Sequence, residues 1–173
     1  MRILLTKTQI ADKVQELGAQ ISEDYQDKNP ILIGLLKGSV VFLADLMRTL
    51  KIPHTIDFIR ASSYGAGMTS SGQVHVTSMD VDVENRHVLL IEDIIDSGVT
   101  LQYLKEVLID RKPASLCVCA LLDKPASRRT YEKVDYCGFT IPDVFVVGYG
   151  LDWNEQYRHL PYVAVVEEQE NGP

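Results

Sequence analysis

The fold of this 173-residue chain is decided by one stretch, Val88-Leu89-Leu90-Ile91-Glu92-Asp93-Ile94-Ile95-Asp96-Ser97-Gly98-Val99-Thr100-Leu101. Its first four residues are all apolar, which is typical of a strand that is covered on both faces in the centre of a parallel sheet. From Leu101 onward, Leu and Val recur at helical spacing as far as Lys112-Pro113, which predicts a helix. The small polar residues between these two elements therefore lie in a strand-to-helix turn.

A turn of this kind can hold a phosphate group. It directs backbone N–H groups and the positive end of the following helix toward one point. Gly98 lets the backbone approach a ligand closely, and the hydroxyls of Ser97 and Thr100 add donors. The alternative is an ordinary helix start capped by Ser97 or Asp96, and the turn alone favours that alternative.

Three carboxylates lie close together in this stretch, at Glu92, Asp93 and Asp96. Like charges at this spacing repel one another unless a cation or a set of hydroxyl donors compensates them. A ribose diol or Mg²⁺ would provide that compensation. The carboxylates therefore favour a ligand site over a simple capped helix.

The stretch closely resembles the phosphoribosyl-diphosphate signature of type I phosphoribosyltransferases. That signature has four apolar residues, two acidic residues, further apolar residues, and then Asp, Ser or Thr, Gly and Thr. From about Ile31 to Val166 the chain resembles the 6-oxopurine branch, the hypoxanthine-guanine phosphoribosyltransferases. The resemblance implies an α/β fold, with a twisted, mainly parallel sheet flanked by helices. A small hood over the base would come from the C-terminal region, with or without the N-terminus.

The resemblance also implies roles for the residues of the central stretch. The 5′-phosphate would bind the turn, and the acidic pair Glu92 and Asp93 would hold the ribose hydroxyls. Asp96 would lie beside N7 of the purine and act as general base. The residues of the implied phosphate turn are Asp96, Ser97, Gly98, Val99 and Thr100. Val99 stands where some family members carry a charged residue, which matters little because the turn binds through backbone amides.

Further site residues are implied in three other segments. Pyrophosphate would be bound by Lys37, Gly38 and Arg158, with a strained or cis peptide often found before this Gly in the family. The purine would contact Lys124 through its O6 atom, Phe145 by stacking and Val146 through backbone groups. Mg²⁺ would be held by Asp152 together with Glu92 and Asp93.

The reaction that the resemblance implies is purine salvage. The 5-phosphoribosyl group of phosphoribosyl diphosphate would pass to N9 of hypoxanthine or guanine, giving IMP or GMP and pyrophosphate. Mg²⁺ is the implied cofactor, and a homodimer or homotetramer is the implied assembly.

The rest of the chain reads as alternating helices and strands. Ile10, Val14, Leu17 and Ile21 recur at helical spacing and predict an amphipathic helix that packs on the core. One predicted helix spans 8–25, and another begins at the turn 37–39 and runs to residue 50. The further predicted strands are 31–36, 54–61, 73–77, 115–122, 143–147 and 162–166. The segment 62–72 is rich in Gly and Ser, which predicts either a surface hairpin loop or a mobile lid. The family has such a lid, and Ser63 and Tyr64 of this chain stand at the matching position.

Composition sets the remaining bounds. The length favours a single domain over residues 1–173. A net charge of −7 and a pI near 5.0 argue against a nucleic-acid-binding surface. No signal peptide or membrane-spanning stretch is expected, so the predicted location is the cytoplasm. The three cysteines are expected to be free thiols, and the four histidines match no zinc pattern.

Other functions fit the sequence less well. The chain has neither the P-loop motif nor the three-glycine dinucleotide motif. A receiver domain would leave the segment Ser97 to Thr100 unexplained. A regulator that binds phosphoribosyl diphosphate without catalysis should carry a basic face or an added DNA-binding domain. A phosphoribosyltransferase for orotate or adenine is disfavoured by Lys124 and by the segment Phe145 to Asp152.

Overall fold

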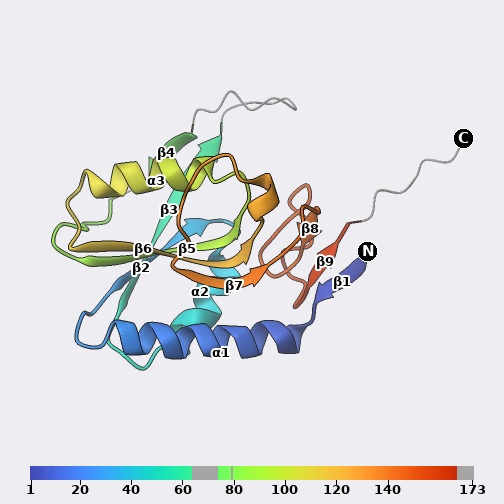
Figure 1. Cartoon of the computed structure of the whole chain (residues 1–173), viewed down its shortest axis with the longest axis horizontal. Coiled ribbons are helices and arrows are strands. Elements are labelled where there is room, and N and C mark those ends of the chain that lie inside the picture. Colours follow the sequence, from blue (N-terminus) through green and yellow to red (C-terminus); the bar gives the residue numbers. More distant parts are fainter. Residues whose placement is uncertain (64–73, 79, 167–173) are drawn as a thin grey trace, which may run out of the picture.

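A twisted sheet lies at the centre of the molecule, which the computed structural model describes at residues 1–63, 74–78 and 80–166 (Figure 1). Six strands of the described chain form it in the order β4-β3-β2-β5-β6-β7. Five of them are parallel, and β4 joins the edge antiparallel to β3. The strands are β2 (Ile31–Leu36), β3 (Thr55–Ser63), β4 (Val74–Ser78), β5 (His87–Ile95), β6 (Ser115–Asp123) and β7 (Tyr136–Thr140).

The predicted central strand, β5, does lie in the middle of this sheet. It pairs with β2 on one side and with β6 on the other, both in parallel. Its apolar run from Val88 to Ile91 is fully buried, because side chains on both faces of the strand pack under helices. The strand continues four residues beyond this run, so Glu92 and Asp93 belong to β5 and do not terminate it.

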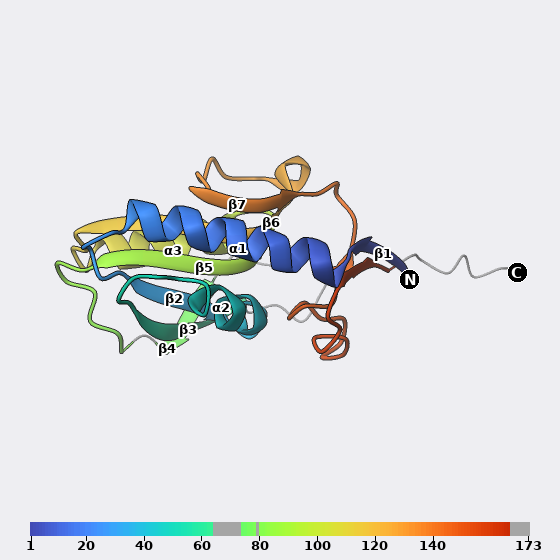
Figure 2. The same cartoon turned by 90° about the horizontal axis from the view of Figure 1, so that it is seen from below.

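Helices cover both faces of the sheet. On one face lie α1 (Lys7–Asp24) and α2 (Val40–Met47), and on the other lies α3 (Val99–Ile109) (Figures 1 and 2). The predicted amphipathic stripe of α1 is buried, as expected. Thr6 caps this helix in a capping box with Gln9, which satisfies two backbone N–H groups at its start. A short 3₁₀ helix, η1 (Pro125–Ser127), follows β6.

A second, smaller sheet joins the two ends of the described chain. It has the order β1-β9-β8 and consists of β1 (Arg2–Leu5), β8 (Val146–Val147) and β9 (Val163–Val165). All of its pairings are antiparallel. Figure 2 shows it at one end of the molecule, beyond the central sheet. The N-terminal strand therefore stabilises the C-terminal segment that follows β7.

Several element boundaries differ from the predicted ones. The strand expected at 143–147 is reduced to β8, and the helix expected to run to residue 50 ends at Met47. The strands β1 and β7 were not predicted. The expected lid at 62–72, including Tyr64, lies outside the described residues, except that β3 ends at Ser63.

The cysteines behave as predicted in the described structure. All three are free thiols; Cys119 is buried in the apolar core on the α1 face of the sheet, and the half-buried Cys117 packs against that core. No described helix has the length and apolar character needed to cross a bilayer.

Candidate active site

Three polar turns meet at one edge of the central sheet. They follow the carboxyl ends of β2, β5 and β6, which are neighbouring parallel strands. Open α/β sheets bind ligands at this edge, because the loops that leave parallel strands converge there. Two adjoining cavities of about 340 and 180 Å³ lie at this edge, and Asp93, Ile94 and Asp96 line both of them.

The smaller cavity is formed by the turn between β5 and α3. Ser97, Gly98 and Thr100 line it, whereas Val99, the first residue of α3, does not. Gly98 has φ +81°, a left-handed conformation that a side chain would strain, and a Cβ there would lie 2.3 Å from Oγ1 of Thr130. The opening N–H groups of α3 together with two hydroxyls make this cavity suitable for an anion such as a phosphate.

The acidic pair near the end of β5 consists of a buried Glu92 and a half-buried Asp93. Glu92 lines the smaller cavity and is 4% exposed, while Asp93 reaches both cavities. Burial, reinforced by the neighbouring Asp93, holds the pKa of Glu92 well above its usual range. Burial also raises the pKa of Asp93 to about 6, against the opposing effect of a hydrogen bond from the Ile94 N–H. Hydroxyl donors or a cation would stabilise the charged forms of both carboxyls.

The turn after β2 packs directly against Asp93. A Cβ atom at Gly38 would lie 1.8 Å from Oδ2 of Asp93, and a Cβ at Gly150 would lie 2.1 Å from the carbonyl oxygen of Gly38. Glycine is therefore required at both positions for this close packing. The peptide bond between Leu36 and Lys37 is cis, one bond earlier than the one directly before Gly38.

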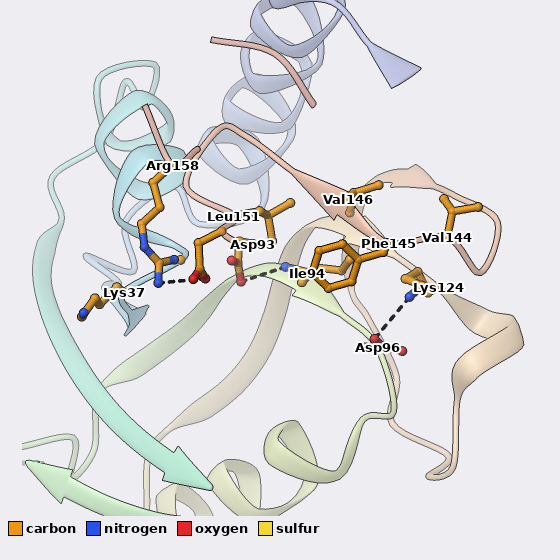
Figure 3. Close-up of a pocket in the computed structure, with 12 residues that line it drawn as sticks. Lys37, Asp93, Ile94, Asp96, Lys124, Val144, Phe145, Val146, Leu151 and Arg158 are labelled. Carbon is orange, nitrogen blue, oxygen red and sulfur yellow. Dashed lines mark hydrogen bonds and ion pairs between the residues drawn. The ribbon is translucent and has the colours of Figure 1, made fainter. Parts of the chain in front are cut away.

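The larger cavity has a cationic end and an aromatic end. Figure 3 shows Lys37 and Arg158 at one end and Phe145 beside Lys124 at the other, with Asp93 between them. The remaining lining residues come from all three turns and from the segment around β8. The full lining is Lys37, Gly38, Asp93, Ile94, Asp96, Lys124, Val144, Phe145, Val146, Leu151, Asp152 and Arg158.

Carboxylates neutralise the cationic end in the described structure. Lys37 Nζ lies 2.8 Å from Oε2 of Glu155. Arg158 Nη2 lies 2.8 Å from Oδ1 of Asp152 and 3.5 Å from Oε1 of Glu155. Arg158 also donates from Nη1 to the Gly150 carbonyl at 2.8 Å, while its buried Nε has no hydrogen-bond partner in the described chain. Glu155 thus pairs with both cations.

The aromatic end is built around a buried ammonium. The side chain of Lys124 is 8% exposed, and its Nζ lies 3.2 Å from Oδ2 of Asp96 and 3.0 Å from Oδ1 of Asp143. Burial acts to lower the pKa of Lys124, but the two carboxylates outweigh burial and raise that pKa above its usual value. Phe145 is 54% exposed although it is a large apolar residue, so its ring is available for a planar ligand.

The structure brings most of the predicted site residues together at this edge. Those around the two cavities are Lys37, Gly38, Glu92, Asp93, Asp96, Ser97, Gly98, Thr100, Lys124, Phe145, Val146, Asp152 and Arg158. Val146 is buried in β8, opposite Val165 of β9. Sequence reasoning missed the contacts of Asp143 and Glu155, and no local pattern distinguishes these two acids from surface acids.

The chain is similar to known proteins over nearly its whole length. The family model described as "Phosphoribosyl transferase domain" matches residues 2–154. The hypoxanthine phosphoribosyltransferase of Salmonella typhimurium is 47% identical over 169 residues, which covers 96% of this chain and 95% of that protein. The hypoxanthine-guanine phosphoribosyltransferase of Bacillus subtilis is 47% identical over 167 residues, covering 96% and 93%.

Solved structures give the same result. A hypoxanthine phosphoribosyltransferase from Staphylococcus aureus superposes with a TM-score of 0.92 at 43% identity, covering 96% of this chain and 91% of that one. A hypoxanthine-guanine phosphoribosyltransferase from Bacillus anthracis also gives a TM-score of 0.92, at 45% identity, covering 96% and 99%. The similarity therefore extends over nearly the whole chain in both sequence and fold.

Proposed function

Because this chain belongs to the phosphoribosyltransferase family, we propose that it transfers the 5-phosphoribosyl group of phosphoribosyl diphosphate to N9 of hypoxanthine or guanine. The products are IMP or GMP and pyrophosphate, and the reaction serves purine salvage in the cytoplasm. The observation that carries the proposal is the larger cavity, in which a cationic end and an aromatic end lie on either side of Asp93. A diphosphate, a ribose and a purine fit this order of groups.

The phosphoribosyl group binds at two neighbouring parts of the site, the turn before α3 and the acidic pair of β5. The 5′-phosphate binds in the smaller cavity, where Ser97, Gly98 and Thr100 supply donors and Val99 contributes its backbone amide. The ribose hydroxyls donate to Glu92 and Asp93, whose burial makes them sensitive to such donors. These contacts fix C1′ of the ribose between the base and the diphosphate, and such positioning accounts for much of the acceleration.

The diphosphate binds at the cationic end. Lys37 and Arg158 face the position of the leaving group, and the turn at Gly38 brings backbone groups close to it. Negative charge develops on the diphosphate as its bond to C1′ breaks. Cations already in place at that position stabilise the transition state without having to reorganise.

The carboxylates of the site fit a Mg²⁺ ion shared with the substrate. In the described chain no three or more His, Cys, Asp and Glu side chains gather as a complete metal cage. Asp93 and Asp152 nevertheless line the same cavity and lie close enough for their charges to interact, with Glu92 next to Asp93. Mg²⁺ is commonly bound by one or two carboxylates together with substrate phosphates, and it would neutralise charge on the diphosphate.

The purine binds at the aromatic end. Its ring stacks on the exposed face of Phe145, Lys124 donates to O6, and backbone groups of Val146 face the base edge. Asp96 accepts the proton from N7 while N9 attacks C1′, so it acts as the general base. Its 56% exposed side chain already reaches the cavity from the start of the turn.

An assay with a panel of free bases tests the proposal. The full chain is incubated with phosphoribosyl diphosphate, Mg²⁺ and one base at a time, and the nucleotide formed is quantified. IMP and GMP are the expected products, and AMP and orotidine monophosphate should be negligible. The proposed substrate class would be wrong if neither hypoxanthine nor guanine gave nucleotide, or if orotate were the preferred base.

The assembly is proposed on the resemblance to the family. We expect a homodimer or homotetramer, which light scattering of the purified chain would distinguish from a monomer.

A further inference from the structure

Asp143 is a second carboxylate that contacts the Lys124 ammonium, besides the proposed general base Asp96. It lies in the segment between β7 and β8, and its Oδ1 is 3.0 Å from Lys124 Nζ. Asp96, at the end of β5, approaches the same nitrogen at 3.2 Å. The ammonium is therefore held between carboxylates from two different elements.

The local backbone keeps Asp143 in this position. The N–H of Ile141 donates to the carbonyl of Asp123 at 2.9 Å, which attaches the segment to the end of β6 beside Lys124. The N–H of Val144 donates to the carbonyl of Pro142 at 2.9 Å, which closes a tight turn around Asp143. Proline restricts the backbone further, so the carboxylate is held by a constrained turn.

The donor count of the ammonium determines what this arrangement does. A lysine ammonium has three N–H bonds and accepts none. One of them donates to Asp96, and the ammonium forms an ion pair with Asp143 at 3.0 Å, so an N–H bond remains for a ligand. Lys124 lines the larger cavity, and Figure 3 shows it beside Phe145, where the purine is proposed to stack.

We propose that Asp143 is a positioning residue that determines base specificity by directing the free N–H of Lys124 toward the oxygen at position 6 of the purine. This inference rests on the proposed role of Lys124. Asp143 itself does not line the cavity, and its side chain is 61% exposed at the rim. It therefore acts on the base through Lys124.

Asp143 also limits how strongly Lys124 engages the general base. In its absence, Asp96 would be the remaining carboxylate partner of this buried ammonium in the described chain, and a closer pair would turn the N–H bonds toward Asp96 and away from the purine. The ion pair would then occupy oxygen atoms that Asp96 needs in order to accept the N7 proton. Sharing the cation between two carboxylates keeps Asp96 available.

Product binding with and without the position-6 oxygen tests this role. Calorimetry compares IMP with purine riboside 5′-monophosphate, which lacks that oxygen, on the full chain and on Asp143→Ala. The variant should bind IMP about two- to fivefold more weakly, a modest loss because Asp143, the partner that is removed, is 61% exposed. It should bind the nucleotide without the oxygen as tightly as the unmodified chain does. If Asp143 had a merely structural role, the variant would bind both nucleotides more weakly.

Three further variants make the test specific. Asp143→Glu restores the carboxylate and should recover part of the IMP affinity, whereas Asp12→Ala, at an exposed acid on α1, should change neither affinity. Lys124→Ala should abolish the difference between the two nucleotides. If Lys124→Ala abolishes the affinity difference between the two nucleotides while Asp143→Ala leaves it intact, the role of Asp143 is refuted and the role of Lys124 stands. If Lys124→Ala leaves the difference intact, the proposed contact to O6 fails, and this inference fails with it.

Discussion

Gly38 and Asp93 lie so close together that a Cβ atom at Gly38 would be 1.8 Å from Oδ2 of Asp93. The contact joins the turn after β2 to the acidic end of β5, and so joins the proposed diphosphate site to the proposed ribose site. The two sites are therefore built as one unit, and a change at Gly38 should affect both stability and substrate binding.

Gly38→Ala should destabilise the chain and weaken its affinity for phosphoribosyl diphosphate. The new methyl group would displace the half-buried Asp93 carboxylate, and overpacking of this kind costs about 1–3 kcal/mol. Urea unfolding measures the stability, and calorimetry with phosphoribosyl diphosphate and Mg²⁺ measures the affinity. The double variant Gly38→Ala, Asp93→Ala should lose less stability than the sum of the two single variants, because the second change removes the clash. Strict additivity would contradict the contact.

Asp96→Asn should lower turnover roughly 10²- to 10⁴-fold, the usual contribution of general acid–base catalysis. The amide keeps the shape of the side chain but cannot take the N7 proton. Affinity for phosphoribosyl diphosphate should remain nearly unchanged, since the donors of the phosphate turn stay in place. Steady-state kinetics and calorimetry separate the two effects, with Asp110→Asn at the end of α3 as a control. Turnover equal to that of the unmodified enzyme would remove Asp96 from the role of base.

The central sheet was predictable because its strands are marked by local patterns. The apolar runs at 31–36 and 88–91 predicted β2 and the core of β5, since strands buried on both faces need apolar side chains throughout. β1 was missed because its four residues form a strand only by pairing with β9, at the other end of the chain. Long-range pairing of this kind leaves little trace in a short segment.

The candidate site likewise has parts that a local pattern predicts and parts that depend on contacts between distant residues. The strand-to-helix turn at 96–98 was predictable because its residues are consecutive and resemble a specific signature, and its phosphate-binding role stays a prediction. The pairing of Lys37 with Glu155 spans 118 residues, and the contact of Asp143 with Lys124 depends on how the segment after β7 is attached to the end of β6. Both acids look like ordinary surface residues until the fold brings them beside a cation.

Glu155→Gln should strengthen the binding of pyrophosphate. Glu155 pairs with Lys37 at 2.8 Å and with Arg158 at 3.5 Å, so the diphosphate has to compete with its carboxylate for both cations. Removing that charge should raise the affinity about two- to fivefold, because an exposed ion pair contributes no more than about 1 kcal/mol. Calorimetry at low ionic strength measures the change, and added salt should reduce it.

A matched control for this variant is Glu16→Gln, which removes an exposed ion pair with Lys13 on α1, away from the cavities. It should leave pyrophosphate affinity unchanged. A weaker affinity in Glu155→Gln would mean that Glu155 supports the cationic end and does not compete with the ligand.

Lys124 should determine which purines react. Its ammonium can only donate, and it is nearly buried, so a base with a carbonyl oxygen at position 6 satisfies it, whereas the amino group of adenine places donor against donor. A site built around one polar group discriminates by roughly 10⁴-fold against a base that leaves this group unpaired. Shape alone gives a discrimination of only about 10- to 200-fold. Adenine should therefore be a negligible substrate. Lys124→Ala should lower kcat/KM for hypoxanthine and guanine and narrow the difference in kcat/KM between these bases and adenine, with phosphoribosyl diphosphate affinity nearly intact.

Lys105→Ala, at a partly buried and paired lysine on α3, serves as the control and should leave the base preference unchanged. Efficient use of adenine by the unmodified enzyme, or an unaltered preference in Lys124→Ala, would show that specificity arises elsewhere in the cavity.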